Sequence, residues 1–202
     1  MARSGFVIDT FWCPKEGNTS EDYEDASSIV QGPEGCRVAI ADGATESSFS
    51  KLWASLLVDH FTKSSEEGPE FFYDLGSPRE EWKDHVGQRQ LPWYAEEKAG
   101  MGAFAAVLGF TADYWSRRWV AVAVGDCCLF QLDFGPRGAR LVESFPLTKS
   151  EEFGFSPYLL GTTPESSENF DKSIRMQSGT MQVPDDFKKK LQDRIQRART
   201  RR

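Results

Sequence analysis

Two short apolar runs of the chain each end on an aspartate beside a glycine. Residues 37–46 read RVAIADGATE, and residues 117–126 read RRWVAVAVGD. Both runs are rich in residues that favour β-strands. A carboxylate at a strand end is often only a turn residue. Two of them, closing two such strands, can instead meet at one end of a sheet and hold a metal ion.

The spacing of apolar residues predicts short strands followed by a helix. Three strands are expected, with Gly- and Pro-containing turns between them, at residues 5–12, 21–30 and 36–42. Over residues 47–61, SSFSKLWASLLVDHF, apolar residues recur at three and four positions, which is the period of one helix face. Thr45 or Ser47 is the expected N-cap. A helix is therefore expected directly after the first Asp-Gly pair.

The second half of the chain returns to the strand period. Further helices are expected at 78–88 and 92–99, each beginning at a proline. Strands joined by short turns follow at residues 102–113, 114–126, 127–135, 138–146 and, at a sheet edge, 172–182. Short links make antiparallel sheets, and nearly continuous apolar strands need cover on both faces. The pattern predicts an α+β fold, a four-layer αββα sandwich of two antiparallel sheets flanked by helices.

The charge of the chain is unevenly distributed. The formal net charge is −7, yet residues 188–202 carry eight bases and one acid, a net of +7, which leaves −14 on residues 1–187. An acidic body of this kind suits cation binding. It argues against a nucleic-acid partner, whose phosphates attract basic surfaces.

Apolar runs and cysteine spacing indicate a location. The first residues, MARSGFVIDTFWCP, hold an apolar run too short for a signal peptide, and no stretch approaches the roughly 18 apolar residues of a membrane span. The cysteines show no CxxC or metal-site spacing, so reduced structural roles are expected, with Cys127 and Cys128 as core residues. A cytoplasmic protein with no membrane partner is the plain expectation.

Several oxygen-bearing residues stand at the predicted strand ends: Glu24, Asp25, Asp42, Gly43 and Asp126. Mg2+ and Mn2+ prefer oxygen ligands at about 2.1 Å, usually carboxylates and water. Gly43 has no side chain to keep a backbone carbonyl away from an ion. Two ions roughly 3.5 to 4 Å apart can activate water for attack on phosphorus. Hydrolysis of a phosphate ester is thus the chemistry open to such a site.

The motifs at these positions resemble a known family, the metal-dependent protein phosphatases of the 2C type. YEDASSI at 23–29 is similar to its Asn-Glu-Asp-Ala motif, and VAIADGATE at 38–46 to its apolar strand ending in Asp-Gly. MGAFAAVLGF at 101–110 and WVAVAVGDCCLFQL at 119–132 follow in the family order, with a weaker match, SGTMQ, at 178–182. The order and spacing of the motifs carry the resemblance.

The resemblance implies a fold, a reaction and a role for each site residue. The family fold is a β-sandwich of two antiparallel sheets flanked by helices. Asp42 would bridge two Mg2+ or Mn2+ ions and Gly43 would offer its carbonyl to one of them. Asp25 would hold the metals directly or through water, Glu24 would orient bound water, and Asp126 would lie near a weaker third ion. The implied reaction is hydrolysis of phosphoserine or phosphothreonine by metal-bound hydroxide.

The chain departs from the family pattern at three places. Residues 44–46 read Ala-Thr-Glu, where many members have His-Gly-Gly after Asp-Gly, and the nearest upstream base is Lys15 rather than an arginine. The resemblance ends at Phe187, before the family's later metal-binding aspartates. We therefore expect a C-terminally incomplete phosphatase 2C-like domain over 1–187 and a basic helix or tail over 188–202.

Two functions of different class remain open. One is a metal-dependent phosphoprotein phosphatase, weak or in need of a completing strand; the other is a pseudophosphatase that binds a phosphoprotein or a kinase. A third reading is an unrelated sandwich in which Asp42 and Asp126 are ordinary turn residues. Trp82, Trp93 and Tyr94, which lie between prolines, are expected either to line a partner groove or to pack on the sheet.

Overall fold

The computed structural model describes most of the chain up to Met181. The described residues are 7–14, 16–17, 19, 23–45, 47–136, 138–154, 157–164 and 168–181. The predicted basic helix or tail, 188–202, and the end of the predicted domain at Phe187 lie outside them. No helix among the described residues is both long enough and apolar enough to cross a bilayer.

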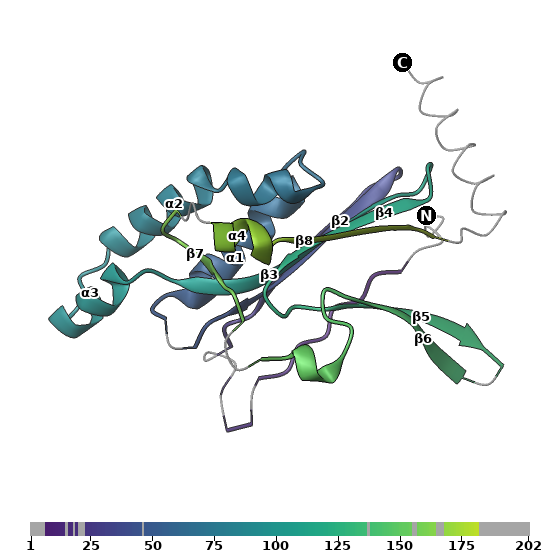
Figure 1. Ribbon diagram of the computed structural model, residues 1–202. Coiled ribbons are helices and arrows are strands. Elements are labelled where there is room, and N and C mark those ends of the chain that lie inside the picture. The colour runs from purple at the N-terminus through teal and green to yellow at the C-terminus, as the bar shows by residue number, and fades with distance from the viewer. Residues whose placement is uncertain are drawn as a thin grey trace, which may run out of the picture.

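A major antiparallel sheet forms the centre of the molecule (Figure 1). Its strand order is β1-β2-β3-β4-β8, and β7 pairs with β3. The strands are β1 (Ala26–Gln31), β2 (Gly35–Gly43), β3 (Phe104–Asp113), β4 (Arg118–Val124), β7 (Leu160–Gly161) and β8 (Arg175–Thr180). The two apolar runs that end in Asp-Gly and Gly-Asp thus include β2 and β4, which flank β3.

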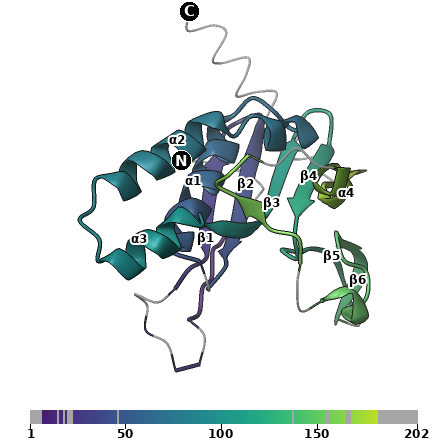
Figure 2. The same ribbon diagram turned by 60° about the vertical axis from the view of Figure 1, so that its left-hand side comes forward.

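The helices gather over one face of this sheet (Figures 1 and 2). They are α1 (Ser50–Lys63), α2 (Gly76–Gly87), α3 (Trp93–Gly100) and α4 (Glu168–Ser173), with short 3-10 turns at Pro69–Tyr73 and Ser150–Glu152. Each of the four α-helices contributes side chains to the same apolar cluster. We call this side of the sheet the helix-side face, and the other side the open face.

Alternation along the strands assigns side chains to the two faces. Ala39 and Ala41 of β2 and Val107 of β3 belong to the cluster under α1, whereas Leu108 and Ala121 belong to a second cluster on the open face. This is the expected result of side chains that point to opposite faces in turn. Both faces of the central strands are buried, which explains why their sequences are almost continuously apolar.

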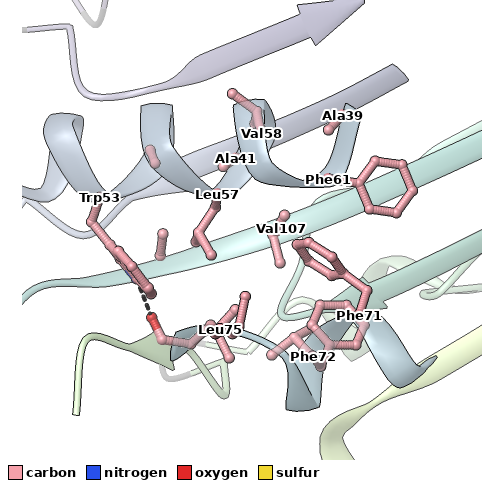
Figure 3. Packing of buried hydrophobic residues seen from close by; sticks show 14 of the residues in the cluster. Ala39, Ala41, Trp53, Leu57, Val58, Phe61, Phe71, Phe72, Leu75 and Val107 are labelled. Carbon is pink, nitrogen blue, oxygen red and sulfur yellow. Dashed lines mark hydrogen bonds between the residues drawn. The ribbon is translucent and has the colours of Figure 1, made fainter. Parts of the chain in front are cut away.

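The main core lies between α1 and the helix-side face (Figure 3). Trp53, Leu57 and Phe61 of α1 are fully buried there. Their spacing by four places them on one side of the helix. The indole of Trp53 also donates to the carbonyl of Leu160, 2.8 Å away. This bond ties α1 to β7 through a fully buried polar contact.

Arg37 of β2 fastens the other end of α1. Its guanidinium donates to the carbonyl of Phe61 at 2.8 and 3.1 Å and to the carbonyl of Glu66. It also lies 4.6 Å from the centre of the Phe61 ring. The last carbonyls of a helix have no donor within the helix. Here Arg37 of the neighbouring strand provides the donor for the Phe61 carbonyl.

The second sheet is a two-stranded hairpin that stands apart from the major sheet (Figures 1 and 2). It consists of β5 (Leu129–Gly135) and β6 (Gly138–Phe145). Leu129 and Phe145 at its base pack into the open-face cluster, and Gln177 of β8 donates to Glu143 of β6. The outer part of the hairpin is exposed.

The predicted α+β class with two antiparallel sheets is confirmed. The described residues supply one helical layer and the two sheets of the αββα prediction; no α-helix of this part of the chain covers the outer side of the β5–β6 hairpin. The remaining layer therefore stays a prediction.

Two local predictions are wrong. Residues 7–12 of the predicted first strand form no strand, although their composition favours one. Helix α1 has Phe49 at its N-cap, with φ 61°, and no side-chain cap. Ser47 instead bonds the carbonyl of Ala44 at 2.9 Å within the preceding turn. The helix therefore begins four residues later than a cap at Thr45 would place it, and two residues later than a cap at Ser47 would.

Candidate active site

Asp25 and Asp42 stand beside one another at the end of the β1–β2 pair. Ala26 pairs with Ala41 in the antiparallel register, so the next residue outward on each strand brings the two aspartates together. Because both alanines face α1, alternation directs both aspartates to the open face. The two residues line one cavity of about 500 Å3. The structure thus unites two of the four carboxylates selected from the sequence.

Gly43 allows the chain to pass closely beside the preceding strand. A Cβ at this position would lie 2.8 Å from the carbonyl oxygen of Glu24 and 3.0 Å from Ser50. Any side chain would therefore push β2 away from β1 or from the start of α1. The glycine of the Asp-Gly motif is explained by this close approach. Whether its carbonyl serves a metal stays a prediction.

Glu24 is engaged at the start of α1. Its carboxylate accepts a hydrogen bond of 2.9 Å from the Ser50 hydroxyl. Because Glu24 neighbours Asp25 in an extended segment, its side chain points to the opposite side of the strand. This arrangement anchors α1 to the strand end that carries Asp25. A water-orienting role for Glu24 stays a prediction.

Asp126 follows β4 through a tight change of direction. Gly125 has φ 94°, a conformation that other residues rarely adopt, and a Cβ there would lie 2.6 Å from the Ala106 side chain. Asp126 is partly buried, and its carbonyl accepts from the Cys128 thiol at 3.2 Å. The cavity lining includes Cys127 but not Asp126. Asp126 therefore lies next to the cavity rather than in its wall.

The raised pKa of Cys127 indicates that its thiol lies near the three aspartates of the site. Burial raises the pKa of its thiol to about 12, and the charges of Asp42 and Asp126 and, more weakly, Asp25 act in the same direction. A thiolate formed here would lie close to three carboxylates. Cys127 packs against the open-face cluster, in agreement with its prediction as a core residue, and its side chain also lines the cavity.

An aromatic wall forms the other side of the cavity, and sequence reasoning missed it. Phe11, Trp12 and Tyr23 line it, and the rings of Trp12 and Tyr23 lie 5.5 Å apart at 51°. The Tyr23 hydroxyl donates to Asp25; burial, followed by the charge of Asp25, raises the pKa of Tyr23. The sequence feature that could have indicated this wall is a run of aromatic residues beside acids and a proline. Its composition was interpreted as that of a strand.

The donor set fits a hard divalent cation only in part. Carboxylate oxygens such as those of Asp25 and Asp42 are the ligands that Mg2+ and Mn2+ prefer, and Mg2+ is often held by one or two carboxylates together with water or phosphate oxygens. Among the described residues, no group of three or more His, Cys, Asp or Glu side chains is placed to hold a metal ion. A two-carboxylate site is therefore the arrangement these residues support.

None of the described residues that line the cavity is basic. Its polar and charged groups come from Thr10, Tyr23, Asp25, Ser27, Asp42 and Cys127. A phosphate group entering this cavity would meet two carboxylates and no cation from the described chain. Electrostatic repulsion would oppose its binding unless a positive charge accompanied it.

Comparison with known proteins finds similarity to solved structures alone. No family model matches the sequence, and no curated protein matches it. The solved structures that match include RsbX in complex with magnesium, at 20% identity over 85% of this chain and 66% of that one, with a TM-score of 0.45.

Two further matches are serine phosphatases of bacteria. The serine/threonine phosphatase Stp1 from Staphylococcus aureus is 16% identical over 79% of this chain and 66% of its own, with a TM-score of 0.46. A bacterial serine phosphatase variant is 12% identical over 78% of this chain and 67% of its own, with a TM-score of 0.49. The chain spans about two thirds of the length of these proteins. This similarity is one of partial fold, so function must be argued from the site.

Proposed function

We propose that the protein is a divalent-metal-dependent phosphatase of the 2C type that hydrolyses phosphoserine and phosphothreonine monoesters, with low efficiency. One observation carries the proposal: Asp25 and Asp42 line a single cavity, and none of the described residues in its lining is basic. A phosphate ester can bind beside two carboxylates only if cations compensate its charge. The sequence motifs that contain these aspartates supply the reaction type by resemblance.

The residues of the chain have distinct tasks in this proposal. Asp25 and Asp42 would hold Mg2+ or Mn2+, which when bound would supply Lewis-acid activation of water and neutralise phosphate charge. Tyr23 donates to Asp25 and so fixes the orientation of that carboxylate. The bond between Glu24 and Ser50 holds the strand end against α1. Fixed ligands of this kind lose little freedom on binding an ion.

The expected low efficiency is inferred from one position of the site. Ala44 occupies the position after the Asp-Gly pair, and its amide bonds the Phe104 carbonyl at 2.9 Å. An alanine cannot donate a proton to a leaving alkoxide, a task that a general acid performs with a rate gain of about 100 to 10,000-fold. Substrates with a good leaving group, such as aryl phosphates, should therefore be hydrolysed faster than phosphoserine.

Metal binding and hydrolysis can be measured separately. We expect Mn2+ to bind the wild type in calorimetric titrations and to bind Asp42→Asn more than tenfold more weakly, since even indirect partners of a metal contribute about 10 to 100-fold. Asp133→Asn, at an exposed aspartate of the hairpin, is the matched control and should bind Mn2+ like the wild type. Hydrolysis of p-nitrophenyl phosphate at millimolar Mn2+ should be slower in Asp42→Asn than in the wild type and unchanged in Asp133→Asn. Equal Mn2+ affinity in all three proteins would refute the site.

A pseudophosphatase is the second candidate, and a specific observation favours it. The described carboxylates form a pair rather than a group of three ligands. Such a site can retain an ion while lacking turnover, and the domain would then bind a phosphoprotein or a kinase. Mn2+ binding that depends on Asp42, without hydrolysis of aryl phosphate or phosphopeptide, would identify this case.

The cytoplasmic location expected from the sequence stays a prediction.

A further inference from the structure

The cavity is larger than a site for ions requires. Its volume of about 500 Å3 extends from the two aspartates to the aromatic wall of Phe11, Trp12 and Tyr23. This is within the range of ligand pockets, about 300 to 1,000 Å3. Trp12 keeps 60% of its surface exposed and Phe11 keeps 91%. Large aromatic side chains left open beside a cavity indicate that something covers them.

The segment of sequence that supplies the wall is rich in acids. Between Asp9 and Asp25 the chain carries six acids and a single base, Lys15. The exposed aromatic rings therefore lie in an acidic segment of the sequence, and the hydroxyl of Tyr23, the partly buried residue of the wall, donates to the carboxylate of Asp25. Aromatic faces carry negative electrostatic potential and attract cations within about 6 Å.

We propose that the wall of Trp12 and Tyr23 is a subsite for a lysine or arginine side chain of a peptide, next to the residue whose phosphate enters at Asp25 and Asp42. The proposal rests on the proposed function for the reaction, but the recognition of the basic side chain does not require hydrolysis. The expected substrate is therefore a peptide with basic residues, in agreement with the −14 charge of residues 1–187.

The geometry favours a side chain with an apolar stem and a cationic head. The stem of lysine or arginine can lie along the open face, where Ile40 lines the same cavity. The head can then contact the Trp12 ring, with the surrounding carboxylates as its counter-charge. A ring pair already in contact, at 5.5 Å between centroids, loses little freedom when the ligand arrives.

Binding of unphosphorylated peptides in EDTA tests the subsite without metal or turnover. The probes are two acetylated hexapeptides that differ in having two Arg or two Glu beside a central serine. In calorimetry we expect the Arg peptide to bind and the Glu peptide not to bind. Trp12→Ala should weaken Arg-peptide binding by about fivefold, the equivalent of about 1 kcal/mol. Trp12→Phe, which keeps a ring, should retain most of the affinity.

Trp93→Ala is the matched control, because Trp93 of α3 is 76% exposed and lies outside the cavity lining. It should bind the Arg peptide like the wild type. Equal affinity of Trp12→Ala and Trp93→Ala, with both folded by circular dichroism, would overturn the proposal, as would equal binding of the Arg and Glu peptides. Arg-peptide binding that requires Trp12 supports the subsite even if no phosphate ester is hydrolysed, in which case only the proposed reaction fails.

Discussion

The helix-side face and the open face of the major sheet differ in how they are covered. On the helix-side face, Trp53 and Leu57 of α1 have no exposed surface. On the open face, Ile29 and Ile40 near the aspartates are 37% and 36% exposed. The helix-side face is packed as a protein interior, whereas the end of the open face beside the cavity is left accessible.

The difference separates stability from chemistry. Burial of apolar area is the dominant favourable contribution to folding, and the larger of the two buried clusters lies on the helix-side face. Carboxylates such as those of Asp25 and Asp42 are poorly suited to such an interior, because transfer of a charge out of water is costly. They require a face that solvent, ions and ligands can reach. A sheet with one closed face and one partly open face meets both requirements.

The largest expected effect is that of Trp53→Ala, which removes a buried side chain from the core on the helix-side face. Removal of a fully buried indole should lower the free energy of unfolding by about 3 to 5 kcal/mol, because the cavity left behind cannot be filled completely. The carbonyl of Leu160 also loses its 2.8 Å donor. Urea unfolding followed by circular dichroism at pH 7 measures the change.

Trp93→Ala is the control for this experiment as well. Its side chain is 76% exposed on α3, so its removal should change the free energy of unfolding by no more than about 0.5 kcal/mol. A loss of similar size in both variants would contradict the assignment of stability to the face under α1.

Tyr114→Phe tests the open-face cluster, with an intermediate effect. Tyr114 is buried there, and its hydroxyl accepts from Gln31 at 3.2 Å. Loss of this bond should lower the free energy of unfolding by about 1 kcal/mol at pH 7. Burial, and then the hydrogen bond with Cys36, raises the pKa of Tyr114 from 10.0 to about 12.

The raised pKa of Tyr114 also predicts a dependence on pH. Above pH 10 the unfolded chain loses this proton while the folded protein keeps it, so stability is complete below pH 10 and is lost as the pH rises to about 12. Tyr114→Phe should show a smaller decrease in this window than the wild type, measured by urea unfolding at several pH values. Tyr94→Phe, at an exposed tyrosine of α3, serves as the control. Equal decreases in wild type and Tyr114→Phe would show that Tyr114 does not cause the loss.

Most of the fold could be predicted from the period of apolar residues. The central strands β2, β3 and β4 and the helix α1 follow from patterns that local sequence and tertiary packing both satisfy. Trp82, for which groove lining and packing were both open, is buried in the main core. The segment 7–12 was assigned wrongly, because composition alone cannot distinguish a strand from an aromatic wall beside a cavity.

The site could be predicted only at its aspartates. Asp25 and Asp42 follow from strand ends that neighbour one another in an antiparallel sheet. The side of the strand on which Glu24 lies depends on register, which a single sequence specifies weakly. Cys127 and Trp12 reach the cavity through contacts between segments far apart in the chain. Nothing in the local pattern of either residue indicates such a contact.

The smallest expected effect is that of Leu132→Ala in the β5–β6 hairpin. It allows the stability contributed by the exposed hairpin to be compared with that contributed by the helix-side face. Leu132 pairs with Leu141 across the hairpin, and both keep about half of their surface exposed, 47% and 53%. Such a pair is worth about 0.2 to 1 kcal/mol, so the free energy of unfolding should fall by less than about 1 kcal/mol. Leu57→Ala, the same change at a fully buried position, should cost about 2 to 5 kcal/mol. If urea unfolding gave both variants the same loss, the hairpin would be covered in solution, and the second sheet would belong to the stabilising core.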